Sequence, residues 1–194
     1  TLIYLAAALL TVLYSVPPFR FKRYGWLANL TIAIPRGLLL VVAGFSIAYP
    51  ESIKTAEPWI IGGVLALYLL GAASTKDFAD MHGDRIGGVR SLPVMYGARR
   101  ATKIIAPFLS LPFATLPVLT GLHMLGHAPL ILHGNQQLLG LLGAMLMLWG
   151  VAAGGMLVSS PGALSSTENH PVWRHMYGIM TAYLVGTAVC YWRM

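Results

Sequence analysis

Long apolar runs separated by short polar stretches dominate the pattern along the chain. Six such runs occur, near residues 1–17, 26–48, 58–75, 101–122, 138–158 and 171–192. A helix of about 20 residues crosses the ~30 Å hydrocarbon core of a bilayer, so each run has roughly the length of a membrane span. A membrane barrel would instead alternate apolar and polar residues, and "LLGLLGAMLMLWGVAAGGMLV" does not. The pattern predicts an all-α fold, a polytopic transmembrane helical bundle in one domain over residues 1–194.

Prolines interrupt two of the predicted helices. Pro35 and Arg36 lie inside the second run, and the fourth run contains Pro107, Pro112 and Pro117. Proline removes a backbone hydrogen bond and bends a helix, and membrane bundles tolerate this where a neighbour or a cavity satisfies the freed carbonyl. We expect irregular helices at both places.

The charge of the loops alternates along the chain. Lys and Arg gather in the loops at 19–25 and 76–103 and follow the 159–170 loop at Arg174, whereas the 49–57 and 123–137 loops carry no positive excess. Positively charged loops stay on the cytoplasmic side of a membrane. The sequence therefore predicts an integral protein of the inner (cytoplasmic) membrane, with the loops at 19–25, 76–103 and 159–170 facing the cytoplasm.

Composition supports the same environment. Hydrophobic residues make up 57% of the 194 residues and charged residues only 10%, far below the roughly one quarter of a soluble domain. The net charge of +7 lies mostly in the loops, where it suits membrane lipid headgroups or phosphates, so we expect no nucleic-acid partner. A single cysteine, Cys190, excludes an internal disulfide and a cysteine-built metal site.

Half of the six acidic residues fall within eight positions, as Asp77, Asp80 and Asp84. In a continuing helix this i, i+3, i+7 spacing would place all three on one face, where they would repel one another. A cation offsets that repulsion, and hard carboxylate oxygens favour Mg²⁺, which keeps waters and accepts substrate phosphate as further ligands. Arg90 can bind the same phosphate. A solvated loop with surface ion pairs is the alternative.

A basic segment, "YSVPPFRFKRYGWLANL" from Tyr14 to Leu30, belongs to a loop predicted on the same membrane side. Lys22 and Arg23 read as a clamp for a diphosphate, and Arg36 adds charge inside a helix about two turns from Asn29. The alternative is a topology anchor with an aromatic belt.

These two stretches resemble the UbiA superfamily of membrane prenyltransferases, whose members have nine transmembrane helices and two aspartate-rich motifs. "KDFADMHGDRIGGVRSLPVMYG" is similar to the second motif and matches its D-x-x-x-D core to Asp80 and Asp84, with Asp77 as an extra upstream acid. "YSVPPFRFKRYGWLAN" is similar to the segment between the fourth and fifth helices and matches its diphosphate-side residues to Tyr14, Lys22 and Arg23. The six runs would then be helices four to nine.

The resemblance implies a Mg²⁺-dependent transfer of a prenyl group from a polyprenyl diphosphate to a lipophilic acceptor. Asp80, Asp84, Lys22 and Arg23 would be catalytic, and all three aspartates would bind the metal. The residues expected to bind the substrate are Tyr14, Asn29, Arg36 and Arg90. The acceptor would be aromatic, a quinone precursor or a (bacterio)chlorophyllide. Aromatic faces such as Tyr68 or Trp149 could stabilise an allylic cation or simply pack.

One family feature is missing. The first motif, N-D-x-x-D-x-x-x-D, does not occur, and every aspartate of the chain is already used. We expect that three N-terminal helices precede this sequence in the full protein and that the fragment alone is inactive.

Two other readings of the acidic loop stay open. A CDP-alcohol phosphotransferase also pairs acids with Mg²⁺, although "DFADMHGDRIGG" lacks its D-G-x-x-A-R order. A Mg²⁺ or cation channel would use the acids as a selectivity ring and would not need Lys22 and Arg23. His123, His127 and His133 fit an interfacial loop, with no carboxylate expected nearby, better than a metal site.

Overall fold

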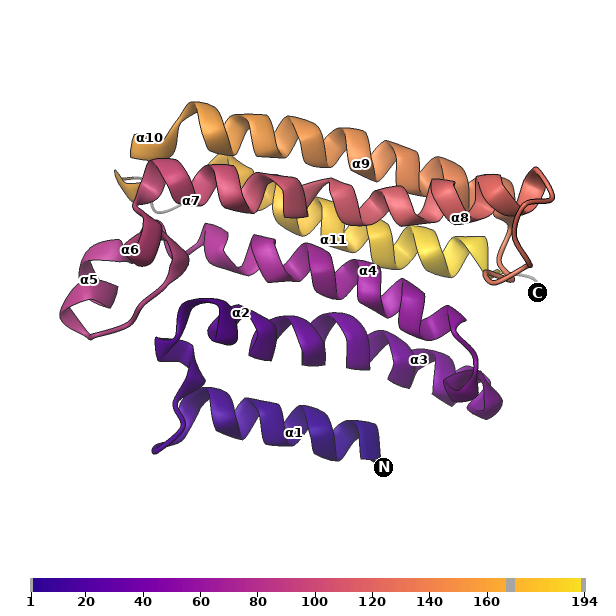
Figure 1. Cartoon of the computed structure of the whole chain (residues 1–194), viewed down its shortest axis with the longest axis horizontal. Helices are drawn as coiled ribbons and strands as arrows, with labels where there is room; N and C mark the ends of the chain where they lie inside the picture. Colours follow the sequence, from indigo (N-terminus) through magenta and orange to yellow (C-terminus); the bar gives the residue numbers. More distant parts are fainter. Residues whose placement is uncertain (1, 167–169, 193–194) are drawn as a thin grey trace.

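The computed structural model describes residues 2–166 and 170–192, and in this part every regular element is a helix. Six helical rods lie side by side along one direction (Figure 1). They are α1 (Leu2–Ser15), α2–η2–α3 (Gly25–Ala33, Ile34–Leu39, Leu40–Ala48), α4 (Glu57–Ala72), α7–η5–η6–α8 (Ala98–Ile105, Ala106–Leu109, Leu111–Ala114, Thr115–Met124), α9 (Gln136–Ser159) and α11 (Pro171–Cys190). The predicted helical bundle is confirmed, and each predicted run begins and ends within about three residues of a rod.

Four of these rods are long and apolar enough to cross a membrane, namely Gly25–Ala48, Glu57–Thr75, Ala98–Met124 and Gln136–Ser159. The expectation of six full spans is therefore met only in part. The described α1 has 14 residues, about 21 Å of helix, which is shorter than the hydrocarbon core. Helix α11 has 20 residues but carries Trp173, Arg174 and His175 among its first five residues.

Both predicted irregularities are confirmed. Around Pro35 the second rod becomes a π-helix over Ile34–Leu39, and around Pro107 and Pro112 the fourth rod tightens into two 3₁₀ segments. The π-helix packs tightly on α4, because a Cβ added at Gly37 would lie 2.5 Å from Ala66 Cα. Only glycine permits this approach.

The core runs through the centre of the bundle along α4, which contacts α2, α3, η5 and α11. Its aromatic members join distant helices: Tyr68 of α4 and Tyr183 of α11 both pack on Phe113, with ring centroids 5.2 and 5.5 Å apart. Each phenol also donates a hydrogen bond to a backbone carbonyl on another helix, Tyr68 to Met176 and Tyr183 to Ile61. Buried hydroxyls are thus paired at the bundle centre.

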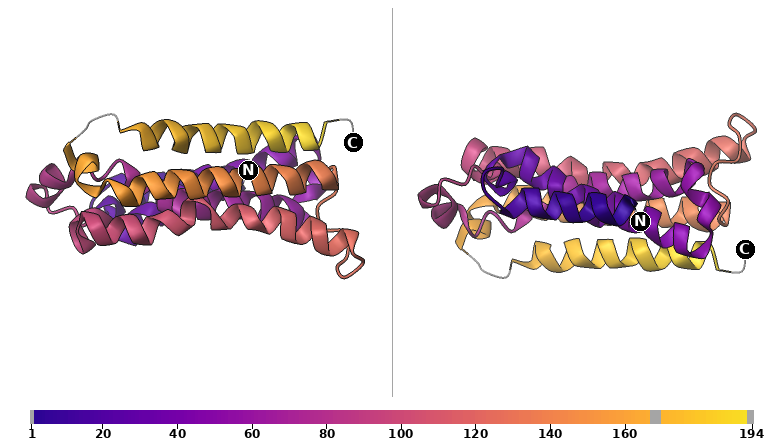
Figure 2. Two further views of the ribbon diagram at one scale, coloured as in Figure 1. Left: turned by 90° about the horizontal axis from the view of Figure 1, so that it is seen from above. Right: turned by 90° about the horizontal axis from the view of Figure 1, so that it is seen from below.

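The short connecting elements divide between the two ends of the bundle. The α1–α2 turn with η1 (Phe21–Arg23), together with α5 (Met81–Ile86), α6 (Leu92–Tyr96) and α10 (Pro161–Ser166), lies at one end, on the left of Figure 1. The loops before α4 and before α9 lie at the other end. Figure 2 shows the bundle from above and below, with α11 along one side and α7–α8 along the opposite side. The two basic loops, at 19–25 and 76–103, lie at the same end as α10, as the sequence predicts.

Candidate functional site

A cavity of about 270 Å³ opens at the end of the bundle that carries the basic loops. Six of the residues that line it carry chemistry suited to binding a charged ligand: Tyr14, Lys22, Asn29, Asp77, Asp80 and Asp84. They come from α1, η1, α2 and the segment after α4. The structure therefore brings together the two sequence motifs, which lie about fifty residues or more apart.

A backbone contact holds the two loops against each other beside this cavity. The Arg90 N–H donates to the Arg23 carbonyl oxygen at 3.0 Å, and Tyr24 and Arg90 form an isolated parallel β-bridge. Gly25 follows directly, and its φ is +32°. A Cβ added at this position would be crowded, because it would lie only 3.0 Å from the Arg90 carbonyl oxygen. Glycine is needed there for both the conformation and the close approach.

The helix before the aspartates does not continue through them. After α4 the chain passes through η4 (Ala73–Thr75) and a turn, and α5 begins at Met81. The expected single helical face is therefore wrong. Instead the turn folds back, the Asp84 N–H donates to the Asp80 carbonyl at 2.8 Å, and the Val89 N–H donates to the Asp84 carbonyl at 2.8 Å. This path still leaves all three aspartates on the cavity wall.

Asn29 lines the cavity and uses its amide N–H groups within the fold. Its Nδ2 donates to the Leu70 carbonyl and to the Ser74 hydroxyl, each at 2.7 Å. Burial raises the pKa of Asp77 to about 7, a hydrogen bond from the Ser74 side chain opposes this, and the charges of Asp84 and Asp80 raise it further. The carboxylates thus destabilise one another in the absence of a cation.

Among residues 2–166 and 170–192, none of the three aspartate side chains forms an ion pair, although Lys22 lines the same cavity. The two ion pairs of residues 2–166 and 170–192 join Lys54 to Glu51 and His133 to Glu57. In the same residues no group of three His, Cys, Asp or Glu side chains is arranged to hold a metal ion alone. Mg²⁺ commonly binds one or two protein carboxylates and completes its shell with water and phosphate, so this hard-oxygen donor set fits Mg²⁺ together with a phosphate ligand.

Three predicted basic residues lie outside the cavity wall. Arg23 and Arg90 are exposed and adjoin the cavity through their backbone contact. Arg36 lines a neighbouring cavity of about 160 Å³, which shares Tyr14 and Ile32 with the first. Of the predicted clamp, only Lys22 faces the aspartate cavity.

The two aromatic residues considered for cation stabilisation do not line this cavity. Tyr68 is fully buried and donates to the Met176 carbonyl at 2.8 Å. Trp149 donates its indole N–H to His175 Nδ1 at 3.0 Å. Both contacts join helices, which favours packing over catalysis for these two side chains.

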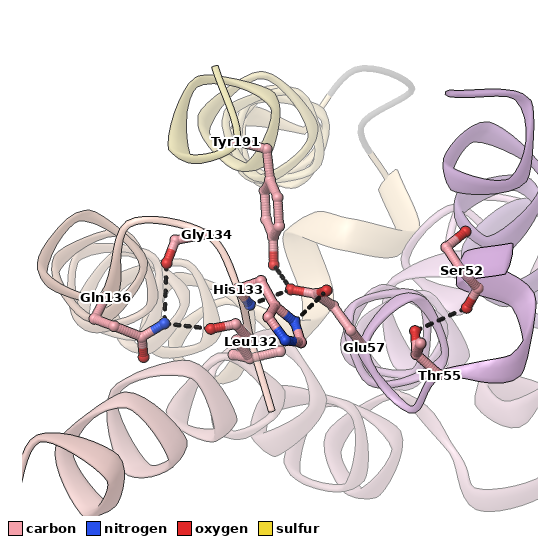
Figure 3. Close-up of polar contacts among 8 residues, drawn as sticks. All are labelled: Ser52, Thr55, Glu57, Leu132, His133, Gly134, Gln136 and Tyr191. Atoms are coloured by element: carbon pink, nitrogen blue, oxygen red, sulfur yellow. Dashed lines mark hydrogen bonds and ion pairs between the residues drawn. The ribbon is translucent and has the colours of Figure 1, made fainter. Parts of the chain in front are cut away.

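At the opposite end of the bundle, Glu57 forms a polar cluster that the sequence did not reveal (Figure 3). Its carboxylate accepts hydrogen bonds from the His133 backbone N–H and the Tyr191 hydroxyl, and His133 Nδ1 lies 3.0 Å from Glu57 Oε2. The expectation that no carboxylate lies near the histidines is wrong for His133, because folding brings together residues 76 positions apart. This cluster ties the start of α4 to the α8–α9 loop and the end of α11.

Comparison with known proteins identifies the family. The model of the UbiA prenyltransferase family matches residues 1–134, more than half of the chain, and so the chain belongs to this family. The match includes both motifs that line the aspartate cavity. No solved structure matches the chain.

Curated relatives include several named prenyl-transfer enzymes. The chain is 36% identical over 92 residues to the bacteriochlorophyll synthase 34 kDa chain of Chloroflexus aurantiacus, covering 47% of this chain and 29% of that protein. It is 26% identical over 129 residues to digeranylgeranylglyceryl phosphate synthase of Methanobrevibacter smithii, covering 66% of this chain and 45% of that protein. A homogentisate phytyltransferase of Synechocystis is 29% identical over 116 residues, covering 57% of this chain and 34% of that protein. The chain thus spans less than half of the length of each.

Proposed function

We propose that the protein containing this chain transfers a prenyl group from a polyprenyl diphosphate to a lipophilic acceptor, and that the aspartate cavity binds the diphosphate. The observation that supports this most directly is that Lys22 and Tyr14 line the same cavity as Asp77, Asp80 and Asp84. A cavity with both a cation and several carboxylates suits a polyanion bound together with a divalent metal ion.

In this proposal the reaction breaks the allylic C–O bond, and the diphosphate leaves with the electron pair. The acceptor then attacks the allylic carbon and loses a proton. Asp80 and Asp84, with Asp77, would hold Mg²⁺, which would supply neutralising charge to the diphosphate. The Lys22 ammonium binds the phosphate oxygens as their charge grows, and the Tyr14 hydroxyl orients them. Arg23, Arg90 and Arg36 add positive charge around the cavity.

The surroundings of the cavity suit an isoprenoid donor. The aspartates lie directly beyond Glu57–Thr75, which is long and apolar enough to span a membrane. A diphosphate at the cavity would leave its prenyl tail among apolar helices, where water is excluded from the allylic cation. Such a site calls for an acceptor that is itself dissolved in the membrane.

We infer an acceptor that is aromatic, a quinone precursor or a (bacterio)chlorophyllide. The names of the relatives refer to bacteriochlorophyll and chlorophyll synthases and to a homogentisate phytyltransferase, which supports this range. Because the loops at 19–25 and 76–103 lie at one end of the bundle and carry nine of the 13 Lys and Arg residues, we place that end in the cytoplasm.

The chain spans only part of its relatives, so the proposed activity belongs to the whole protein. We further propose that a second acidic motif, on helices outside this chain, completes the metal site. The two other readings, a CDP-alcohol phosphotransferase and a cation channel, receive no support from the family match.

The proposal is tested with the full-length protein in membrane vesicles, given labelled geranylgeranyl or farnesyl diphosphate and a panel of acceptors. We expect Mg²⁺-dependent release of diphosphate and labelling of one acceptor. Asp84→Asn, which keeps the side-chain volume, should lower turnover by at least about 100-fold, while the protein still inserts. Undiminished turnover in Asp84→Asn would refute the proposal.

A further inference from the structure

Ser91 lines the aspartate cavity and carries a polar group that its own chain leaves unpaired. The residue is 6% exposed, and its hydroxyl oxygen has no hydrogen-bond partner among the described residues. Buried hydroxyls in folded proteins nearly always have a partner, because an unpaired one has lost its water without compensation. An unpaired hydroxyl at a cavity wall therefore points to a ligand as its partner.

The usual structural role for a serine at this position does not apply. Ser91 precedes the short helix α6 (Leu92–Tyr96), where a serine side chain commonly accepts a hydrogen bond from the first turn. Here the side chain makes no such bond, and the first-turn contact runs instead from the Met95 N–H to the Ser91 backbone carbonyl at 2.9 Å. The hydroxyl is thus not needed to begin α6.

The backbone around Ser91 fixes its position relative to the basic loop. The preceding Arg90 N–H donates to the Arg23 carbonyl, one residue after Lys22. Ser91 and Lys22 therefore line the same cavity from two segments that the Arg90–Arg23 contact holds together. A hydroxyl donor beside an ammonium suits an anionic oxygen.

We propose that the Ser91 hydroxyl donates a hydrogen bond to a phosphate oxygen of the prenyl diphosphate, and that Ser91 is a substrate-binding residue. This inference rests on the proposed function and gives a role to Ser91, which lies within the second motif but was assigned none from the sequence.

The test compares Ser91→Ala with Ser91→Thr in the full-length protein. A hydrogen bond to a charged group is worth about tenfold or more in affinity. Ser91→Ala should raise the KM for geranylgeranyl diphosphate and the inhibition constant of inorganic pyrophosphate by about tenfold, with the acceptor KM unchanged. Ser91→Thr, which keeps the hydroxyl, should restore most of the affinity. The thermal midpoint of the ligand-free protein should not fall in Ser91→Ala.

Ser52 provides a matched control, because it is also 6% exposed with an unpaired hydroxyl but lies in η3 (Pro50–Lys54) at the other end of the bundle. Ser52→Ala should leave both constants unchanged. Unchanged pyrophosphate inhibition in Ser91→Ala, or a lowered midpoint without a change in KM, would overturn the inference while Asp84→Asn remained inactive. Full activity of Asp84→Asn would instead refute the proposed function itself.

Discussion

The two ends of the bundle treat their acidic side chains in opposite ways. At one end, Glu57 accepts hydrogen bonds from the His133 backbone and the Tyr191 hydroxyl and pairs with the His133 ring. At the other end, the three aspartates line a cavity, and in residues 2–166 and 170–192 none of them forms an ion pair with a basic side chain. Both ends border apolar helices, where an unpaired charge is costly.

The difference separates structural from functional acids. Hydrogen bonds from the same chain offset the desolvation cost of a carboxylate whose oxygens accept them. Such a carboxylate also stabilises the helices that it joins. Carboxylates that line one cavity without a basic partner repel one another, and a bound cation offsets that repulsion. We therefore propose that the Glu57 cluster acts on stability and that the aspartate cavity acts on ligand binding.

The largest expected effect on stability comes from Glu57. Glu57→Gln weakens hydrogen bonds to a charged acceptor, so the free energy of unfolding should fall by about 2–3 kcal/mol, with an unchanged KM for the prenyl diphosphate. Thermal unfolding in detergent measures the first and the transfer assay the second. Glu51→Gln is the matched control, since Glu51 pairs with Lys54 at the surface, where an ion pair contributes less than about 1 kcal/mol. A KM change without a stability change in Glu57→Gln would break the distinction.

A smaller effect distinguishes the two neighbouring basic residues of the η1 loop. Lys22 lines the aspartate cavity and Arg23 does not. Lys22→Gln should raise the KM for the prenyl diphosphate about tenfold, because a charge-assisted contact is lost. Arg23→Gln should change it by less than about threefold, as expected for a screened charge outside the wall. Steady-state kinetics at fixed ionic strength measure both, and equal losses would contradict the assignment of Lys22 as the phosphate contact.

The smallest effect concerns Tyr68, at the bundle centre between the two ends. Tyr68→Phe removes the hydrogen bond to the Met176 carbonyl and keeps the ring packing on Phe113. Stability should fall by about 1 kcal/mol, and turnover should not change. A loss of turnover at unchanged stability would show that this ring takes part in the reaction.

Most of the fold follows from the hydrophobic pattern because a bilayer dictates the length of its helices. The rods Gly25–Ala48 and Glu57–Thr75 each begin and end within about one residue of the predicted runs. The irregular segments were predictable from the prolines, because each proline lacks an N–H and disturbs the helix locally. Contacts between distant residues leave no such pattern in the sequence. The hydrogen bond from Tyr191 to Glu57, for example, joins residues 134 positions apart.

The residues that line the candidate site were predictable where they belong to a sequence motif. They were less predictable where the path of the backbone decides which side chains reach the cavity. The three aspartates reach one cavity although the helix expected to align them ends at Ala72. Arg36 and Asn29 line different cavities, because the π-helix at Ile34–Leu39 changes the register that an α-helix would have kept. Ser91 was overlooked because an unpaired hydroxyl is a property of the folded chain.

Binding of inorganic pyrophosphate with Mg²⁺ tests the central claim most directly, because it requires neither donor tail nor acceptor. A ligand that binds only the folded state raises the thermal midpoint as its concentration exceeds the dissociation constant. We expect pyrophosphate with Mg²⁺ to raise the midpoint of the full-length protein and to have no effect on the Asp80→Asn, Asp84→Asn double variant. An equal rise in that variant would contradict the account.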